Sequence, residues 1–275
     1  MTIKMIVTDL DGTFYHHDFT YDRKRFNNLY SLMKEDGIRF VVASGNQYYQ
    51  LISFFDHPEE LTFAAENGGY VVDRGEELFS VSIQPEIWKG VIQVLDDLGV
   101  SDSVAICGKK SAYVMDSMSD PVVDIFRCYF PVIRKVSDVS EIDDQIIKMS
   151  ILTEETVIHS LEERIREQIS DQLRTVTSGQ TSIDLVVKDI NKGKAIQLLM
   201  DRWNICSEEV MAFGDAMNDA EMLKTAGYGF VMANGNPLLK EQFKNITEFS
   251  NDEDGEFIVL EEYFSDREAF LEKYR

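Results

Sequence analysis

The order of apolar segments along the chain constrains its fold more than any other feature of the sequence. Short runs rich in β-branched residues end abruptly at polar loops, and stretches with helical spacing of apolar residues separate them. The runs that predict buried strands are residues 3–8, 38–43, 62–65, 210–213 and 228–232. The predicted helices include residues 21–36, 193–203, 217–225 and 237–243, and a last one after an acidic loop at 251–256. Because strands that alternate with helices pair in parallel, this order predicts a doubly wound α/β sheet.

Between the two series of segments the pattern changes. Residues from about 84 to 187 alternate helical stretches with pairs of short strands, such as 173–177 with 182–187. This pattern is typical of an α+β unit. A chain of 275 residues also exceeds the length at which one hydrophobic core usually keeps growing. We therefore predict a split core domain, residues 1–82 and 188–275, interrupted by an inserted α+β domain, residues 83–187.

The charge balance of the chain is strongly acidic. It carries 49 acidic and 27 basic side chains, which gives a net charge of −22. This balance argues against binding to nucleic acids or to an anionic membrane surface, because both need clustered lysine and arginine. We expect most of the carboxylates, including those of the acidic stretch from Asp252, to be solvated surface groups.

The sequence also carries no sign of secretion or membrane insertion. No segment approaches the roughly 18 apolar residues of a spanning helix, and the N-terminal residues lack a signal-peptide pattern. Cys107, Cys128 and Cys206 are widely spaced without metal-ligand spacing, so we expect free and mostly buried thiols in a reducing compartment. We expect a cytoplasmic protein that is a monomer or a weak oligomer.

The strongest chemical signal is the run DLDGT at residues 9–13, which follows the first predicted strand. Strand periodicity places Asp9 and Asp11 on one face, and Gly12 allows a sharp turn. Open α/β sheets bind their ligands at the carboxyl ends of strands. Two carboxylates this close repel each other, so either one is protonated or a cation compensates them. The alternative is a turn or capping role, which is common for isolated aspartates.

A second acidic cluster, GDAMND at residues 214–219, also follows a short apolar strand and precedes a helix. Asp215 and Asp219 are four residues apart, so the strand end and the helix start can direct them toward one point. Carboxylates that converge at a sheet edge suit Mg²⁺, which takes a few carboxylates, waters and a phosphate oxygen. The alternative is that Asn218 or Asp219 caps the helix.

Two further candidates lie where a strand ends or a helix begins. Ser44 and Gly45 follow the second predicted strand, and a hydroxyl with free backbone amides suits a phosphate oxygen there. An ordinary serine helix cap is the alternative. Lys192 opens the helix that resumes the core domain, and its ammonium can neutralise both a phosphate and a nucleophile. A solvated surface lysine is the alternative.

Taken in order, these four sites resemble motifs I to IV of the haloacid dehalogenase superfamily, and the resemblance covers nearly the whole chain. The α+β insert between motifs II and III is similar to the type IIB cap of the Cof-type group. The resemblance therefore implies a Rossmann-like core with such a cap. Within that group, residues 40–55 look like enterobacterial sugar phosphatases, which share Asn46 where most Cof-type sequences carry arginine.

The resemblance implies a role for each acidic residue. Asp9 would be the nucleophile that forms an aspartyl-phosphate, and Asp11 would be the general acid and base. Mg²⁺ would be held by Asp9, Asp215 and the backbone carbonyl of Asp11. Asp219 would support the metal site without binding the metal.

The resemblance also implies how substrate is held. Ser44, Gly45, Lys192 and Asn218 would bind the phosphate, and Ser44 and Lys192 would also take part in catalysis. The implied function is a Mg²⁺-dependent phosphatase of small sugar phosphates. Two alternatives stay open: a sugar phosphotransferase or phosphomutase on the same scaffold, and a noncatalytic phosphate- or Mg²⁺-binding module. The cap would select the leaving group, with the turns at 178–179 and 108–113 as candidates for contacting it.

Overall fold

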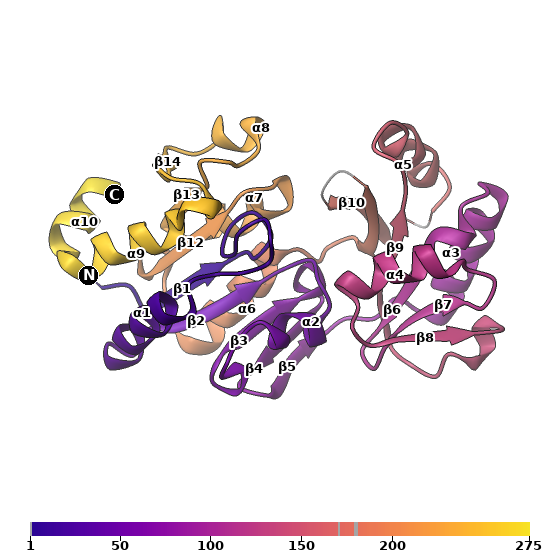
Figure 1. The fold of residues 1–275 in the computed structure, drawn as a ribbon, viewed down its shortest axis with the longest axis horizontal. Helices are drawn as coiled ribbons and strands as arrows, with labels where there is room; N and C mark the ends of the chain where they lie inside the picture. The colour runs from indigo at the N-terminus through magenta and orange to yellow at the C-terminus, as the bar shows by residue number, and fades with distance from the viewer. Residues whose placement is uncertain (1, 170, 179–180) are drawn as a thin grey trace.

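The computed structural model of the chain describes residues 2–169, 171–178 and 181–275. It has a core lobe and a cap lobe, each built around its own β-sheet (Figure 1). The cap lobe is inserted between β5 (Glu76–Ser80) and α6 (Lys192–Trp203) of the core lobe. An α/β core with an inserted α+β cap confirms the predicted fold class. The domain boundaries at 82/83 and 187/188 stay predictions.

The core sheet combines strands from both ends of the chain. Its strands are β1 (Met5–Thr8), β2 (Arg39–Ala43), β3 (Thr62–Ala65), β4 (Tyr70–Asp73), β5, β12 (Val210–Gly214), β13 (Tyr228–Val231) and β14 (Asn245–Ile246). Their order is β14-β13-β12-β1-β2-β3-β4-β5. Neighbours from β14 to β3 pair in parallel, and β4 and β5 add antiparallel strands at one edge. The strand order reverses between β1 and β12, and in such sheets ligands bind at that point.

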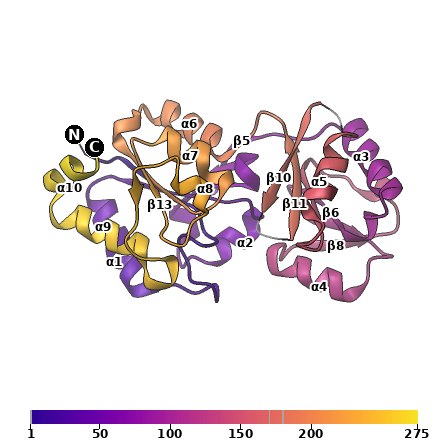
Figure 2. The same ribbon diagram turned by 90° about the horizontal axis from the view of Figure 1, so that it is seen from above.

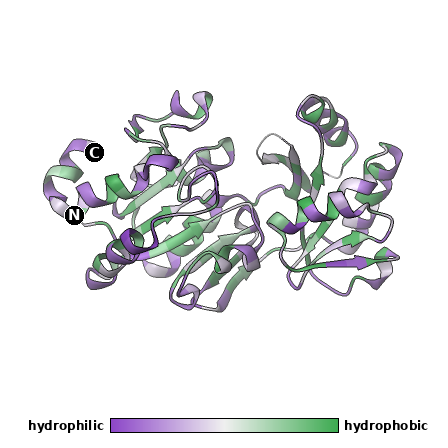
Figure 3. Cartoon of the chain, in the orientation of Figure 1, coloured by the Kyte–Doolittle hydropathy of each residue, from purple (hydrophilic) through white to green (hydrophobic). Residues whose placement is uncertain are grey.

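Helices cover both faces of the core sheet. They are α1 (Arg23–Glu35), α2 (Tyr48–Ser53), α6, α7 (Ala220–Thr225), α8 (Pro237–Lys240), α9 (Gly255–Ser265) and α10 (Arg267–Tyr274). Figure 2 shows α1, α9 and α10 on one side of the sheet and α6 and α7 on the other. Within β1, Ile6 packs into the first layer, whereas Met5 and Val7 pack into the second. The core strands are therefore apolar on both faces, as the green strands of Figure 3 show.

The cap sheet is mostly antiparallel. Its strands are β6 (Val104–Gly108), β7 (Ala112–Met115), β8 (Ile133–Val136), β9 (Ile146–Leu152), β10 (Leu173–Ser178) and β11 (Ser182–Val187), in the order β10-β11-β9-β6-β7-β8. Only the pairing of β7 with β8 is parallel among these described strands. Its helices are α3 (Pro85–Asp97), α4 (Asp120–Tyr129) and α5 (Ile158–Arg166).

The two faces of the cap sheet differ in polarity. Helices α3 and α5 cover one face with a large apolar cluster, and α4 covers part of the other. The remaining part of the second face carries Lys148, Ser150 and Asp184. Lys148 and Asp184 form hydrogen bonds to residues of the core lobe, so this polar area is part of the surface on which the two lobes meet.

Three expectations from the sequence need correction. The chain ends in two helices rather than one, because Asp266 ends α9 and caps α10 through the backbone amide of Ala269. Cys107 is buried, but Cys128 and Cys206 are exposed, so the thiols are not mostly buried. The acidic stretch from Asp252 is not uniformly solvated, because Glu256 in the first turn of α9 is 1% exposed.

Among the described residues, no helix has both the length and the apolar character needed to cross a membrane.

Glu256 lies beneath the strand that leads to the acidic cluster. Its Oε2 atom is 2.6 Å from Oγ1 of Thr8, and the same hydroxyl is 2.6 Å from the backbone oxygen of Asp9. Burial raises the pKa of Glu256 to about 8, so this carboxyl keeps its proton at neutral pH. A protonated Glu256 donates to Thr8, which leaves the hydrogen of Thr8 for the carbonyl of Asp9.

The substitution Glu256→Gln tests this protonation. Between pH 4.5 and about 8, Glu256 stays protonated in the folded chain but ionises in the unfolded chain, so the free energy of unfolding falls as pH rises. Glutamine cannot ionise and removes this dependence. We expect Glu256→Gln to raise the melting temperature, relative to wild type, more at pH 8 than at pH 5.

The control is Glu253→Gln, which changes an exposed carboxylate whose pKa is lowered by its bond from the Ser250 hydroxyl. It should not give a larger gain at pH 8. An equal melting-temperature difference for Glu256→Gln at both pH values would contradict a protonated Glu256.

Candidate active site

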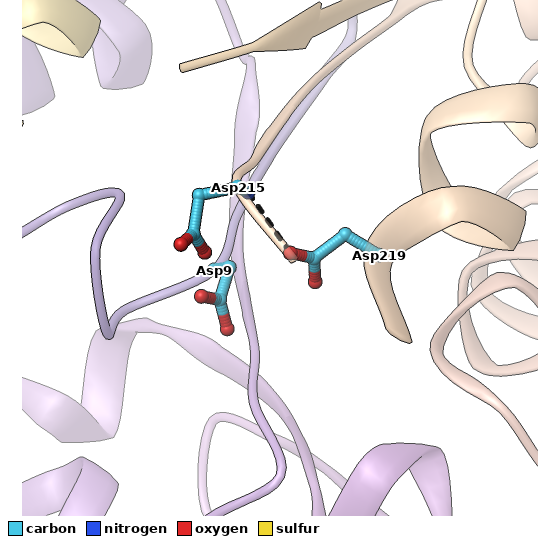
Figure 4. Close-up of side chains that lie close together, drawn as sticks. All are labelled: Asp9, Asp215 and Asp219. Carbon is cyan, nitrogen blue, oxygen red and sulfur yellow. Dashed lines mark hydrogen bonds between the residues drawn. The ribbon is translucent and has the colours of Figure 1, made fainter. Parts of the chain in front are cut away.

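The predicted acidic residues meet where β1 and β12 end side by side. Asp9 follows β1 directly, and Asp215 follows β12. The last residue of β1, Thr8, is paired with Phe213 of β12, so the two strands end at the same level of the sheet. Figure 4 shows Asp9, Asp215 and Asp219 grouped around one point. One carboxylate oxygen from each lies within 4.8 Å of the others. Parallel pairing of two strands from opposite ends of the chain therefore brings both predicted motifs together.

Lys192 lies inside this acidic group. Its Nζ atom donates to Oδ1 of Asp9 and to Oδ1 of Asp219, at 2.6 Å in both cases, and the residue is 1% exposed. Burial alone would lower the pKa of Lys192, but Asp219 and Asp9 together raise it above its usual value. Lys192 is thus a buried ammonium, and its alternative interpretation as a solvated surface lysine is wrong.

Asp219 has both carboxylate oxygens engaged. Oδ1 accepts from Lys192, and Oδ2 accepts from the backbone amides of Asp215 and Ala216, each at 3.0 Å. These bonds close the turn Met217–Asp219 that precedes α7 and hold the end of β12 in place. Asp219 therefore orients Lys192 and Asp215, which leaves Asp9 and Asp215 with free carboxylate oxygens for a ligand.

Gly12 permits the close approach of the two acidic motifs. Its φ of +76° lies in the left-handed region that favours glycine. A Cβ atom at this position would lie 2.5 Å from Oδ2 of Asp215. The side chain of Asn234 donates to the Gly12 carbonyl at 2.7 Å and fixes the turn from the other side. A side chain at position 12 would displace Asp215.

The acidic group has the properties of a site for a divalent cation. Burial raises the pKa of Asp9 well above its usual value against the opposing charge of Lys192, and burial together with Asp219 raises the pKa of Asp215 to about 7. Burial is the largest cause of both pKa shifts, and the neighbouring carboxylates add to it. A buried carboxylate, Asp9, and a half-buried one, Asp215, each with an oxygen left for a ligand, fit a hard cation such as Mg²⁺, which prefers oxygen ligands.

Asp11 is held apart from this group, at the mouth of a cavity. Its Oδ1 accepts from the hydroxyl of Tyr15 at 3.0 Å, and its Oδ2 accepts from the side-chain amide of Asn46 at 2.7 Å. Burial raises the pKa of Asp11 above its ordinary value even though both donors oppose this. A carboxyl that protonates more readily than usual is suited to act as a general acid. Sequence reasoning did not identify Tyr15, whose contact depends on the turn that follows Gly12.

The loop Ser44–Asn46 follows β2. Ser44 is 1% exposed, and its hydroxyl accepts from the backbone amide of Asn46 at 3.1 Å. The residue that caps α2 is Gln47, so Ser44 is not the helix cap that the alternative interpretation required. The carbonyl of Gly45 accepts from Lys148 of the cap lobe at 2.5 Å.

Asn218 contacts a residue outside the acidic group. Its side-chain amide donates to Oδ1 of Asn67 at 3.2 Å, so it contacts the loop after β3. Asn67 has a left-handed backbone and in turn donates to Asp184 of the cap lobe at 3.3 Å. The predicted phosphate-binding residues Gly45 and Asn218 are therefore both connected to the cap.

A cavity of about 240 Å³ opens between the lobes beside Asp11. Its wall on α4 is apolar and aromatic, and its wall on the cap sheet carries hydroxyl groups. The lining residues are Asp11, Asn46, Ile125, Phe126, Tyr129, Phe130, Lys148, Ser150, Leu152, Thr181, Ser182 and Asp184. A leaving group attached to a phosphate at Asp9 would extend into this cavity.

The two turns proposed to contact the leaving group have different outcomes. Gly179 lies outside the described residues, although Thr181 and Ser182 just after it line the cavity. None of residues 108–113 lines the cavity. Lys109 instead donates to the carboxylate of Glu77 on β5, at 2.6 and 2.7 Å.

Lys148 and Asp184 were missed although the sequence carries a signal for them. Each is the one charged residue of a largely apolar strand, IIKMSIL for β9 and SIDLVV for β11. Buried charges are costly unless they are paired, so such positions indicate an interaction within the protein. The partners lie in the other lobe or in a neighbouring strand, which periodicity along one strand does not reveal.

Known proteins share this sequence pattern and this fold. The profile of the haloacid dehalogenase-like hydrolases matches residues 6–259. A 5-amino-6-(5-phospho-D-ribitylamino)uracil phosphatase of Escherichia coli strain K12 is 38% identical over 235 residues, 85% of this chain and 86% of the relative. The structure of SMU.1108c from Streptococcus mutans UA159 matches with a TM-score of 0.91 and 34% identity, over 96% of this chain and 100% of that chain. A haloacid dehalogenase-like hydrolase from Bacteroides thetaiotaomicron matches with a TM-score of 0.84 and 25% identity, again over 96% and 100%.

The substitution Lys192→Met tests the charge balance of the site. It leaves Asp9 and Asp219 buried without their counterion, so we expect the free energy of unfolding at pH 7.5 to fall by about 3–5 kcal/mol. Denaturant unfolding without added metal measures the loss. Lys194→Met is the matched control, because Lys194 lies one half-turn further on α6, is exposed and is 3.7 Å from Asp189. It should cost less than about 0.5 kcal/mol, and an equal loss in both variants would refute the buried-ammonium interpretation.

Proposed function

Because the chain belongs to the haloacid dehalogenase-like hydrolases and is a phosphatase, we propose that it is a Mg²⁺-dependent enzyme that hydrolyses small sugar phosphates through an aspartyl-phosphate on Asp9. One arrangement carries this proposal. The Asp9 carboxylate lies 2.6 Å from the Lys192 ammonium, and Asp11, two residues on, lines the cavity between the lobes. The proposed nucleophile and its counter-charge are thus in direct contact, and the proposed proton donor follows two residues later, beside room for a leaving group.

In the first step, a free carboxylate oxygen of Asp9 attacks phosphorus and the bond to the leaving oxygen breaks. Protonated Asp11 donates its proton to that oxygen, so the alcohol leaves neutral. Tyr15 and Asn46 hold one oxygen each of Asp11 and keep the carboxyl directed toward the cavity. Lys192 balances the charge of Asp9 and of the incoming phosphate.

In the second step, water attacks the aspartyl-phosphate, and ionised Asp11 accepts its proton. The products are inorganic phosphate and regenerated Asp9. The side chains of Asp9 and Asp215, with the carbonyl of Asp11, would hold Mg²⁺. When bound, the ion would offset the repulsion between an anionic nucleophile and a phosphate dianion.

The cavity indicates which leaving groups fit. Ser150, Thr181 and Ser182 offer hydroxyl groups to a polyol, and Ile125 and Tyr129 offer apolar surface to a flat ring. The relative from Escherichia coli is named for a substrate that joins a ribityl chain to a uracil ring. Both features favour including that compound among the substrates, beside simple hexose and pentose phosphates. We place the reaction in the cytoplasm, with no nucleic-acid or membrane partner and with the chain as a monomer or weak oligomer.

Release of inorganic phosphate from a substrate panel tests the function. The panel contains hexose 6-phosphates, pentose 5-phosphates, 5-amino-6-(5-phospho-D-ribitylamino)uracil and p-nitrophenyl phosphate. We expect wild-type protein with Mg²⁺ to release phosphate and Asp9→Asn to release none, because an amide is not a nucleophile. Asp9→Asn should still fold, since Lys192 keeps its bond to Asp219, and its circular dichroism and melting curve check this.

Two results would count against this mechanism. Normal phosphate release by folded Asp9→Asn would exclude Asp9 as the nucleophile. Transfer of phosphate to a second sugar, with no free phosphate unless a bisphosphate is added, would identify a phosphotransferase instead.

Metal removal tests the proposed ion. Chelation with EDTA should abolish turnover and lower the affinity for inorganic phosphate, because the uncompensated carboxylates repel an anion. Addition of Mg²⁺ should restore both, with calorimetry measuring phosphate binding. Asp215→Asn should raise the Mg²⁺ concentration needed for half-maximal activity by about tenfold or more. Equal turnover and equal phosphate affinity with and without Mg²⁺ would overturn the metal assignment.

A further inference from the structure

Lys148 extends from the cap sheet into the core lobe. Its Nζ atom donates to the carbonyl of Gly45 at 2.5 Å and lies 3.1 Å from both Glu66 and Asp184. The side chains of all three charged residues are at most 3% exposed. Burial alone would lower the pKa of Lys148, but Asp184 and Glu66 together raise it above its usual value. A fully charged cap residue therefore contacts the backbone of the loop Ser44–Asn46.

All three carbonyl groups of that loop are held from one side. The Ser44 oxygen accepts from the amide of Asn67 at 3.0 Å, and the Asn46 oxygen accepts from the amide of Glu66 at 3.1 Å. Lys148 holds the carbonyl between them. In a trans peptide the carbonyl and the following amide point in opposite directions. The bonds to the carbonyls of Ser44 and Gly45 therefore turn the amides of residues 45 and 46 away from Lys148 and the turn at 66–68, and the Asn46 amide donates to the Ser44 hydroxyl.

The turn at 66–68 depends on the same lysine. Glu66 and Asn67 both have left-handed backbones, with φ of +53° and +56°, which non-glycine residues adopt at a cost in free energy. The ion pair of Glu66 with Lys148 and the hydrogen bond from Asn67 to Asp184 hold this turn in place. A continuous set of polar contacts thus joins Asn218, Asn67, Asp184 and Lys148 to Gly45.

Another contact between the lobes has no such connection. The side-chain amide of Gln50 donates to the carbonyl of Cys128 on α4 at 2.6 Å. It helps to join the lobes at a buried position, and the described residues show no hydrogen bond from its side chain to the loop Ser44–Asn46. Variants of Lys148 and of Gln50 can therefore distinguish an effect of cap docking from an effect on the conformation of the loop Ser44–Asn46.

We propose that Lys148 is a positioning residue, through which the docked cap holds the loop Ser44–Asn46 in the conformation that receives the phosphate and directs Asn46 to Asp11. This inference rests on the proposed function and deepens it. It makes phosphate binding depend on Lys148, a cap residue that lines the cavity but need not touch the phosphate. By thermodynamic reciprocity, bound phosphate strengthens the docking of the cap.

The first test compares Lys148→Met with Gln50→Ala. Isothermal titration with inorganic phosphate in the presence of Mg²⁺ should show about tenfold or more weaker binding for Lys148→Met, the effect of losing a buried charged hydrogen bond. Its kcat for p-nitrophenyl phosphate should also fall, because Asn46 no longer holds Asp11. Gln50→Ala should stay within about twofold of wild type in both measurements. Equal losses in the two variants would show that cap docking alone matters and would overturn the proposal.

A second pair of variants covers the case in which Lys148→Met does not fold because Glu66 and Asp184 lose their counterion. Glu66→Gln with Asp184→Asn keeps the bond from Lys148 to Gly45, whereas the same pair combined with Lys148→Met removes the bond and every charge. We expect phosphate affinity to drop by about tenfold only in the triple variant. Equal affinity of the double and triple variants would refute the role of Lys148. The experiment measures phosphate binding, so it tests the role of Lys148 even if none of the esters is hydrolysed. A failure to hydrolyse the esters would reject the proposed function but not the role of Lys148.

Discussion

The buried ammonium of Lys192 is the interaction on which the catalytic edge of this protein depends. Asp9, Asp215 and Asp219 converge at the ends of two adjacent strands, and like charges so close together would separate without a cation between them. Lys192 bonds two of the three and comes from the first turn of α6. Because α6 is the first core helix after the cap, the core becomes complete only when the chain has returned from the insert. The proposed nucleophile Asp9 and its counter-charge thus belong to the two separate segments of the core.

Much of the fold could be predicted from the sequence, because local patterns decide it. The strands at 62–65 and 182–187 have the expected bounds, since each is a mostly apolar run enclosed by turn residues. The end of the chain could not be predicted in the same way. Glu256 is buried because Thr8, 248 residues away, provides its hydrogen-bond partner. An acidic residue in an acidic stretch resembles a surface group until its tertiary neighbours are known.

In the candidate site, too, some residues could be predicted from local sequence patterns and others depend on tertiary contacts. Asp9, Asp11, Asp215 and Lys192 could be identified because each lies at a strand end or a helix start, where sheet topology brings distant segments together. Tyr15 and Lys148 could not be assigned a role, since their contacts depend on a turn conformation and on the docking of two lobes. The cap strands did hold a usable signal in the charged residues at 148 and 184. A charge inside an apolar strand indicates a partner but does not identify it.

The close contact between Gly12 and Asp215 also limits how this protein can evolve. The two residues are separated by 203 positions in the chain, yet a methyl group at the first would occupy the space of the second. A side chain at position 12 is tolerable only if residue 215 becomes smaller, and that exchange would remove a carboxylate from the catalytic edge. Position 12 therefore cannot gain a side chain while Asp215 is retained. Among relatives that keep Asp215, glycine is therefore expected at position 12 even where the residues of the cavity wall differ.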